Sequence, residues 1–170
     1  MNMDNHNHLI LPVALFLAAI SLSAHAQSRM RDYGILYGVL KTGKCNAITD
    51  VEGVSVGHAT IDNGKDVHTG VTAIIPHQGN VFLKKCPAAA YVGNGYGKLA
   101  GSTQIRELGT LETPIVLTNT LNVAEGIRGL VTYTLAQEGC GRVGSVNAVV
   151  GETNDGIIND IRKRSVTEQD

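Results

Sequence analysis

Ser55 lies at the centre of Gly53-Val54-Ser55-Val56-Gly57, which matches the pattern GxSxG. In α/β-hydrolases this pattern places a nucleophilic serine on a sharp turn between a strand and a helix. Here Val54 and Val56 alternate with small or polar residues, and no helical periodicity follows for many residues. The sequence therefore predicts that Ser55 projects from a strand, without the turn that would make it a nucleophile.

The densest group of glycines lies in VGNGYGKLAGS. A Walker loop needs a glycine five positions before its Gly-Lys pair and Ser or Thr after it, but Val92 and Leu99 occupy those positions. Gly95 and Gly97 fit only a relaxed dinucleotide pattern, with no acidic residue in the right setting about twenty positions on. The segment predicts a tight loop without a bound cofactor, although its glycines also allow close approach of a substrate chain.

Histidines and cysteines do not form a metal-binding pattern. His58, His68 and His77 each lie near glycine or proline in turn-like sequence, and HExxH is absent. We therefore expect surface or loop histidines and no metal site. The three cysteines are Cys45, Cys86 and Cys140. Because none forms a CxxC pair, either one disulfide forms in an oxidising compartment or all three stay unreacted, and the sequence does not choose.

Polar residues gather in GETNDGIINDIR, directly after an apolar segment. Asn154 and Asn159 carry side-chain amides, which are suitable donors to a developing oxyanion. Asn119 follows another apolar segment in LTNT and has the same setting. A capped turn with surface carboxylates is the competing interpretation, and both stay open at this point.

The elements that would position these residues follow from periodicity. Asn63-Gly64 predicts a hairpin between a strand containing Ser55 and the strand GVTAIIP. AAAYV and TPIVLTNT predict two further strands, and SVNAVVGETNDG predicts a strand and a turn. Residues 123–137 have helical periodicity, with Asn122 as the cap and Gly139 at the end. Thr167 and Asp170 have the spacing of a helix start.

Composition restricts the class of protein. The apolar run from Leu9 to Leu22 is followed by small residues at Ala24 and Ala26, which predicts a signal peptide over residues 1–26 and a secreted or periplasmic protein with no membrane segment after its removal. The remaining chain is formally neutral, because Asp4 is the only charged residue removed. Without a basic patch, nucleic acid is not an expected partner. A core of Val, Ile, Leu and Ala favours an α/β layer structure.

Four blocks carry a resemblance to a known family: NAITDVEGVSVGHATI, AIIPHQGN, VGNGYGKLAGSTQIRELGTLETPIVLTNTL and SVNAVVGETNDGIINDIR. In this order and spacing they resemble the L-aminopeptidase/D-esterases and β-peptidyl aminopeptidases. The resemblance implies a self-processing serine hydrolase with an αββα sandwich similar to the N-terminal-nucleophile hydrolases. It also implies that residues 27–44 are an N-terminal lead and that residues 45–170 are the N-terminal part of a single aminopeptidase domain.

The resemblance also implies where the nucleophile lies. In this family it is the serine freed at the start of a second subunit, beyond Asp170, so Ser55 is not expected to attack the substrate. The implied partners are that downstream segment, a peptide or amide substrate, and further copies in a homo-oligomer. We expect this portion to be inactive by itself. The alternative is a non-catalytic exported module that binds a peptide against a sheet edge.

Site residues carry over one by one. Asn159 resembles the family's oxyanion donor, with Asn154 as second choice. Gly95, Gly97 and Asn119 are expected near the substrate. Lys98 stands where some relatives have a glutamate that receives the substrate amine, and Thr110 where some have a tyrosine near the oxyanion. A lysine would repel an ammonium group, which counts against aminopeptidase specificity but not against the fold. Glu107 and Glu112 are the candidates to substitute for the glutamate.

Overall fold

The computed structural model describes residues 28–170, and the predicted signal peptide lies outside the described residues. Two compact units divide the chain between Lys41 and Thr42. In the first unit, the 3-10 turn η1 (Met30–Tyr33) ends at Gly34, whose φ of 74° is in the left-handed region that glycine tolerates. The Arg31 guanidinium donates to the Tyr37 carbonyl at 2.9 Å.

The second unit consists of short strands and helices joined by loops. The strands are β1 (Ser55–Asp62), β2 (His68–Ile75), β3 (Cys86–Pro87), β4 (Leu99–Ala100), β5 (Thr110–Leu111), β6 (Ile115–Asn119) and β7 (Val149–Thr153). The α-helices are α2 (Ser102–Leu108) and α3 (Val123–Leu135), and the 3-10 turns are η2 (Ile48–Asp50) and η3 (Ile161–Lys163).

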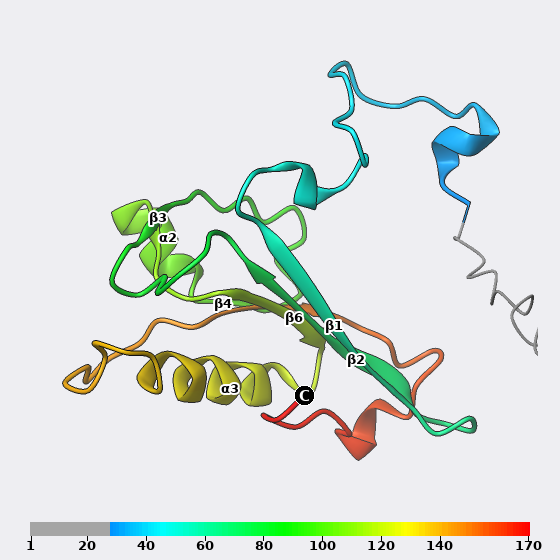
Figure 1. Cartoon of the computed structure of the whole chain (residues 1–170). Coiled ribbons are helices and arrows are strands. Elements are labelled where there is room, and N and C mark those ends of the chain that lie inside the picture. The colour runs from blue at the N-terminus through cyan, green and yellow to red at the C-terminus, as the bar shows by residue number, and fades with distance from the viewer. Residues whose placement is uncertain (1–27) are drawn as a thin grey trace, which may run out of the picture. The chain divides into compact units, whose positions relative to one another are not determined.

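Five of these strands form one sheet in the order β1-β2-β6-β7-β4. Strands β1 and β2 form an antiparallel hairpin, and β6 pairs in parallel with β7 after a crossover through α3. Figure 1 shows α3 running along one face of this sheet. Because parallel strands end at the same edge of a sheet, the polar segments that follow β6 and β7 emerge side by side.

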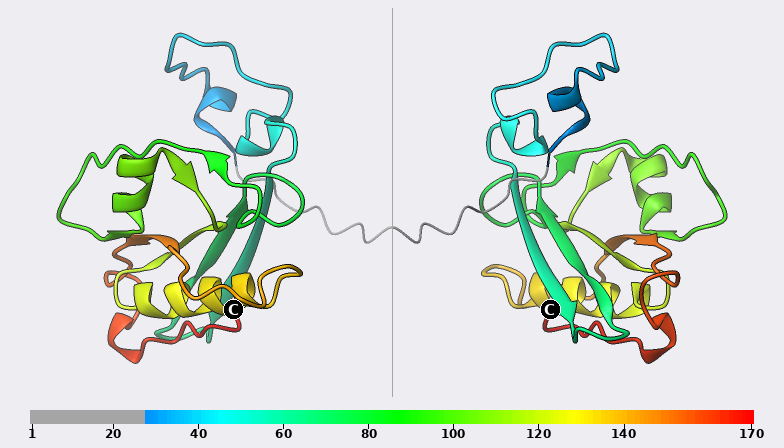
Figure 2. Two further views of the ribbon diagram at one scale, coloured as in Figure 1. Left: turned by 90° about the vertical axis from the view of Figure 1, so that its left-hand side faces the viewer. Right: turned by 90° about the vertical axis from the view of Figure 1, so that its right-hand side faces the viewer.

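Neighbouring residues of β7 fix the two faces of the sheet. Val150 packs with Val116 and with the α3 residue Leu130 in one apolar cluster. Val149 packs with Ile105 of α2 and with Leu111 in a second cluster. Successive strand side chains point to opposite faces, so α3 and α2 cover different faces of the sheet, as Figure 2 shows.

Several sequence predictions are confirmed. The hairpin around Asn63-Gly64, the strand in TPIVLTNT, the strand in NAVVGET and the α3 helix all form. Ser55 is the first residue of β1, and its Oγ accepts a hydrogen bond from Gln78 Nε2 at 3.1 Å. The backbone N–H of Thr167 donates to Asp170 Oδ2 at 2.7 Å, which is the contact of a capping box, although residues 167–170 form a turn and no helix.

One predicted strand does not form, and one helix was not predicted. The expected strand in AAAYV is an irregular segment, because this stretch has no strand partner and the sheet edge next to β7 is taken by β4. The helix α2 was not expected from the sequence. Asn122 is at the N-cap of α3 as predicted, but its side-chain amide donates to the Val166 carbonyl at 2.9 Å instead of capping the helix.

Candidate active site

A cavity of about 750 Å³ lies between the glycine-rich loop and the polar end of β7. Its lining comprises Tyr91, Val92, Gly93, Asn94, Tyr96, Gly97, Lys98, Leu99, Thr120, Gly151, Glu152, Thr153 and Asn154. We call it the loop pocket. It is lined from three segments that are far apart in the sequence, which the sheet brings together.

The pairing of β4 with β7 determines which side chains meet in the loop pocket. Leu99 lies opposite Gly151 in this antiparallel pair. Continuing the register by one residue places Lys98 opposite Glu152. The Lys98 ammonium accordingly lies 2.5 Å from Glu152 Oε2.

The two partners of this ion pair differ in exposure. The Glu152 side chain is 9% exposed and the Lys98 side chain is 55% exposed. The Thr120 hydroxyl donates to Glu152 Oε1 at 3.4 Å, and a Cβ atom at Gly97 would come within 3.3 Å of the same oxygen. Glycine at this position therefore leaves space for the carboxylate, whose contacts are the Lys98 ammonium and the Thr120 hydroxyl.

A second polar group lies beside the loop pocket, at the ends of β2 and β6. Asn119 Nδ2 donates to Thr69 Oγ1 at 2.9 Å, and this hydroxyl donates to Asp155 Oδ2 at 2.6 Å. These three residues border a smaller cavity of about 280 Å³. Asn119 is thus held by a hydrogen-bonded chain and lies outside the loop pocket.

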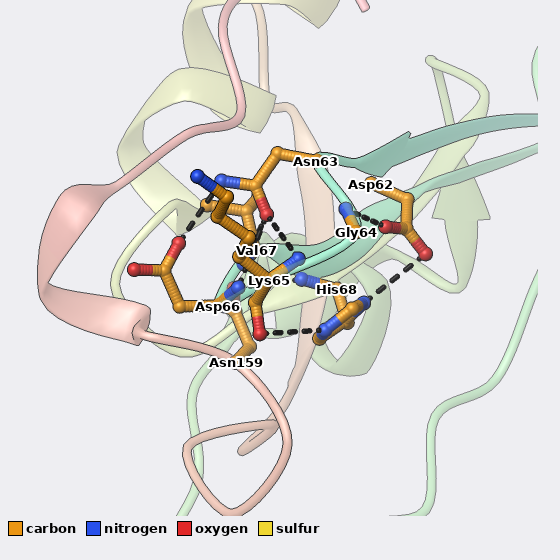
Figure 3. Close-up of polar contacts among 8 residues, drawn as sticks. All are labelled: Asp62, Asn63, Gly64, Lys65, Asp66, Val67, His68 and Asn159. Carbon is orange, nitrogen blue, oxygen red and sulfur yellow. Dashed lines mark hydrogen bonds and ion pairs between the residues drawn. The ribbon is translucent and has the colours of Figure 1, made fainter.

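Asn159 is part of the same chain and is buried. Its Nδ2 donates to Asp155 Oδ1 at 3.1 Å, and its Oδ1 accepts from the His68 backbone N–H at 3.2 Å. Figure 3 shows Asn159 against the turn of the β1–β2 hairpin. One hydrogen of the Nδ2 group is left for another acceptor, so this amide is rigidly placed but mostly engaged in structural contacts.

The hairpin turn is itself fixed by a polar network (Figure 3). Asn63 Oδ1 accepts backbone N–H groups from Lys65, Asp66 and Val67 at 2.9 to 3.1 Å. His68 Nδ1 lies 3.1 Å from Asp62 Oδ2, and this hydrogen bond raises the pKa of His68 above its ordinary value. The same turn contacts η3, because the Lys163 ammonium lies 2.6 Å from Asp66 Oδ2.

Asn154 is the predicted oxyanion residue that lines the loop pocket. Its Oδ1 accepts the Gly156 backbone N–H at 2.9 Å, which leaves the Nδ2 donor without a bond inside the turn. Since an oxyanion needs a donor that is not already committed, this geometry favours Asn154 over Asn159, the reverse of the order given by the sequence.

The remaining predicted residues are distributed unevenly. Gly97 and Lys98 line the loop pocket, and Gly95 belongs to the same loop. Thr110 lies on β5, where it pairs with Pro87, and is not among the residues lining the loop pocket.

Neither carboxylate expected to replace the missing glutamate reaches the loop pocket. Glu107 pairs with Arg106 on α2. Glu112 lies 3.1 Å from the Lys85 ammonium and accepts the Asn147 backbone N–H at 2.8 Å. Burial acts to raise the pKa of Glu112, but the hydrogen bonds from Asn147, Gln104 and Lys85 together hold this pKa below its ordinary value.

Sequence reasoning missed Glu152 as a pocket residue. It had been counted within a polar stretch, without a role. Its signal was its position next to the last residue of β7, where the end of a central strand meets a loop. Tyr91, Tyr96 and Thr120 were missed as well, because their approach depends on the path of an irregular loop.

The histidines lie on both regular and irregular segments. His58 and His68 lie in strands β1 and β2, and His77 lies in a bend. The expectation of surface or loop histidines holds for His58, which is exposed, and for His77, whereas His68 is half-buried in a strand. Across residues 28–170, no group of three or more His, Cys, Asp or Glu side chains could hold a metal ion.

Cys140 is buried, and its Sγ accepts a hydrogen bond from Asn80 Nδ2 at 3.3 Å. Of the helices within residues 28–170, none is both long and apolar enough to span a bilayer.

Comparison with known proteins gives consistent matches. The model of a family described as peptidase family S58 matches residues 46–170. The β-peptidyl aminopeptidase BapA of Sphingosinicella xenopeptidilytica is 34% identical over 173 residues, covering 94% of this chain and 41% of that protein.

Solved structures extend the match to the fold. A protein of Pyrococcus horikoshii OT3 superimposes with a TM-score of 0.78 at 49% identity, over 84% of this chain and 43% of that chain. The L-aminopeptidase D-Ala-esterase/amidase of Ochrobactrum anthropi gives 0.70 at 34% identity, over 84% and 42%, and its structure is described as a new variant of the Ntn hydrolase fold. The resemblance and the predicted fold class are therefore confirmed. The chain spans about two fifths of the length of these relatives.

Proposed function

The chain belongs to peptidase family S58, and from this premise we propose that it forms the substrate-binding part of a serine aminopeptidase whose nucleophile comes from a separate, downstream segment. The substrate would be the N-terminal residue of a peptide, amide or ester. The relatives named as β-peptidyl aminopeptidase and L-aminopeptidase support this class of reaction.

The observation that carries the proposal is the chemical character of the loop pocket. Among residues 28–170, the side chains lining it include no serine and no cysteine. Ser55, the residue at the centre of the GxSxG pattern, lies on the edge strand β1, and its hydroxyl accepts a hydrogen bond from Gln78. The hydroxyls that line it are those of Tyr91, Tyr96, Thr120 and Thr153. The described part of the chain therefore gives the pocket binding groups and amide donors, but not the serine that the proposed reaction uses.

In the proposed reaction, an incoming serine hydroxyl attacks the substrate carbonyl carbon while a base takes its proton. The Oγ–C bond forms, and the carbonyl oxygen becomes an oxyanion that the Asn154 amide stabilises by donation. The C–N bond then breaks as the proton passes to the leaving amine, and water releases the acyl group from the serine. The glycine-rich loop permits the substrate backbone to approach closely.

The test compares two expressed forms. The 170-residue chain alone is expected to hydrolyse aminoacyl p-nitroanilides no faster than buffer, whereas co-expression with the segment encoded in frame downstream is expected to give turnover. Turnover by the chain alone that is lost in Ser55→Ala would contradict the proposal. Absence of turnover in both forms, with retained peptide binding, would favour a non-catalytic binding module.

We also propose export and removal of residues 1–26. N-terminal sequencing of protein recovered from the periplasm or medium is expected to start at Gln27.

A further inference from the structure

The loop pocket contains one cation and one anion among its lining residues, Lys98 and Glu152, and its other lining residues are neutral. The two charges are paired with each other, so the pocket is close to neutral as it stands. Their exposures are unequal, since Glu152 is largely buried and Lys98 is about half exposed. The carboxylate therefore depends on a partner much more than the ammonium does.

An aminopeptidase substrate brings its own cation, the free N-terminal ammonium. Among the described residues that line the loop pocket, only Glu152 offers a carboxylate to receive this ammonium. Binding then requires the Lys98 ammonium to move aside. Exchange of one cation for another keeps the buried carboxylate paired, and the released lysine is solvated because its side chain is flexible and exposed.

After its release from Glu152, the Lys98 ammonium remains next to the N-terminal residue of the bound substrate. Its ammonium carries three donors and no acceptor, so it favours a carboxylate and disfavours a second cation nearby. We propose that the loop pocket selects substrates with an acidic N-terminal residue, whose ammonium binds Glu152 while the side-chain carboxylate binds Lys98. This inference rests on the proposed aminopeptidase function.

Aspartyl and glutamyl residues carry both charges on a short carbon chain, which a cavity of about 750 Å³ accommodates. With such a substrate, two ion pairs replace the one between Lys98 and Glu152: the substrate ammonium pairs with Glu152, and the substrate carboxylate pairs with Lys98. No charge in the pocket is left unpaired. With a lysyl residue, two ammonium groups would compete for Glu152. The order of preference expected from the pocket is therefore acidic, then neutral, then basic.

The experiment measures kcat/KM for aspartyl, alanyl and lysyl p-nitroanilides with the complete protein. The aspartyl substrate is expected to exceed the alanyl one by about fivefold to tenfold, the effect of a partly desolvated ion pair. Lys98→Met is expected to bring the aspartyl-to-alanyl ratio of kcat/KM down to about one. Glu152→Gln is expected to lower kcat/KM for all three substrates. An alanyl or lysyl preference, or an aspartyl preference that survives in Lys98→Met, would overturn the inference.

The chain offers a matched control in Lys85 and Glu112. This ion pair also joins a partly exposed lysine (38%) to a carboxylate that is 9% exposed, at 3.1 Å, but it lies outside the loop pocket. Lys85→Met is expected to leave the aspartyl-to-alanyl ratio unchanged. A ratio that falls equally in Lys85→Met would show that the effect is structural and would refute the role of Lys98.

A binding measurement separates this inference from the proposed function. If the complete protein hydrolyses none of the three substrates, the proposed function fails, and calorimetry on the full 170-residue chain then decides the inference. Aspartyl amide is expected to bind about fivefold to tenfold more tightly than alanyl amide, with the difference lost in Lys98→Met. Equal binding of the two amides, or no binding of either, would refute the inference.

Discussion

Contact between Gly126 of α3 and Val150 of β7 sets how closely the helix approaches the sheet. A Cβ atom built at Gly126 would lie 3.0 Å from Val150 Cγ1 and 3.2 Å from Val116 Cγ1. Val150 is completely buried in this cluster. Because Glu152 lies on β7 two residues after Val150, this contact also positions the loop pocket.

Two single substitutions and their combination test this packing. In Gly126→Ala, overlap with the two valines costs about 1–3 kcal/mol, and the better helix propensity of alanine returns about 1 kcal/mol. We expect a net loss of about 1 kcal/mol in the free energy of unfolding. Val150→Ala removes two buried methyl groups and leaves a cavity, which costs about 2–3 kcal/mol.

The double variant should lose less than the sum of the two. The new methyl at position 126 would enter the space vacated at position 150, so we expect a coupling of about 1–2 kcal/mol. The assay is urea unfolding of all four proteins with the m-value checked for constancy. The matched control is Val149→Ala, the same change on the opposite face, which should be additive with Gly126→Ala. If the losses in Gly126→Ala and Val150→Ala simply add in the double variant, the packing of Gly126 against Val150 is refuted.

Three further outcomes are expected. Asn122→Ala should lower the free energy of unfolding by about 1–3 kcal/mol in urea unfolding, because the buried Asn122 amide donates to the Val166 carbonyl. Asp62→Asn should lower the pKa of His68 in an NMR titration, since the hydrogen bond that the His68 ring donates to the Asp62 carboxylate raises this pKa. In the parent protein the stabilisation from this pair is fully present below the pKa of His68 in the unfolded chain and is lost as pH rises through its pKa in the folded chain. An unchanged pKa would contradict the contact. Gly101→Ala should destabilise the protein by more than about 1 kcal/mol in the same urea assay, because Gly101 has a φ of 79° and its Cβ would lie 2.5 Å from a backbone oxygen, and a neutral result would refute this geometry.

The parts of the fold that were predictable are those with local signals. The hairpin follows from Asn63-Gly64, and α3 follows from its apolar periodicity, because turn chemistry and helix periodicity are properties of neighbouring residues. The segment AAAYV has the composition of a strand but pairs with no other strand, and strand formation depends on a partner that can be distant in the sequence. Helix α2 has only seven residues between two glycines with positive φ, too short to give a clear period.

The candidate site shows the same division. Gly97, Lys98 and Asn154 were selected from local patterns and the resemblance, and all three line the loop pocket. The pairing of Lys98 with Glu152 could not be predicted, because it depends on the register of β4 against β7, two strands that are distant in sequence. The different hydrogen bonding of Asn154 and Asn159 could not be predicted either, because the partners of Asn159 include the distant His68 backbone. Which of the two amides serves the oxyanion stays a prediction.

The central claim is that this chain supplies the substrate pocket and another segment supplies the nucleophile. A serine-directed aminoacyl phosphonate applied to the complete protein, followed by peptide mass spectrometry, tests it most directly. We expect a single labelled serine outside residues 1–170, with labelling reduced by competing substrate. A label on Ser55, or on any other serine of this chain, would contradict the account.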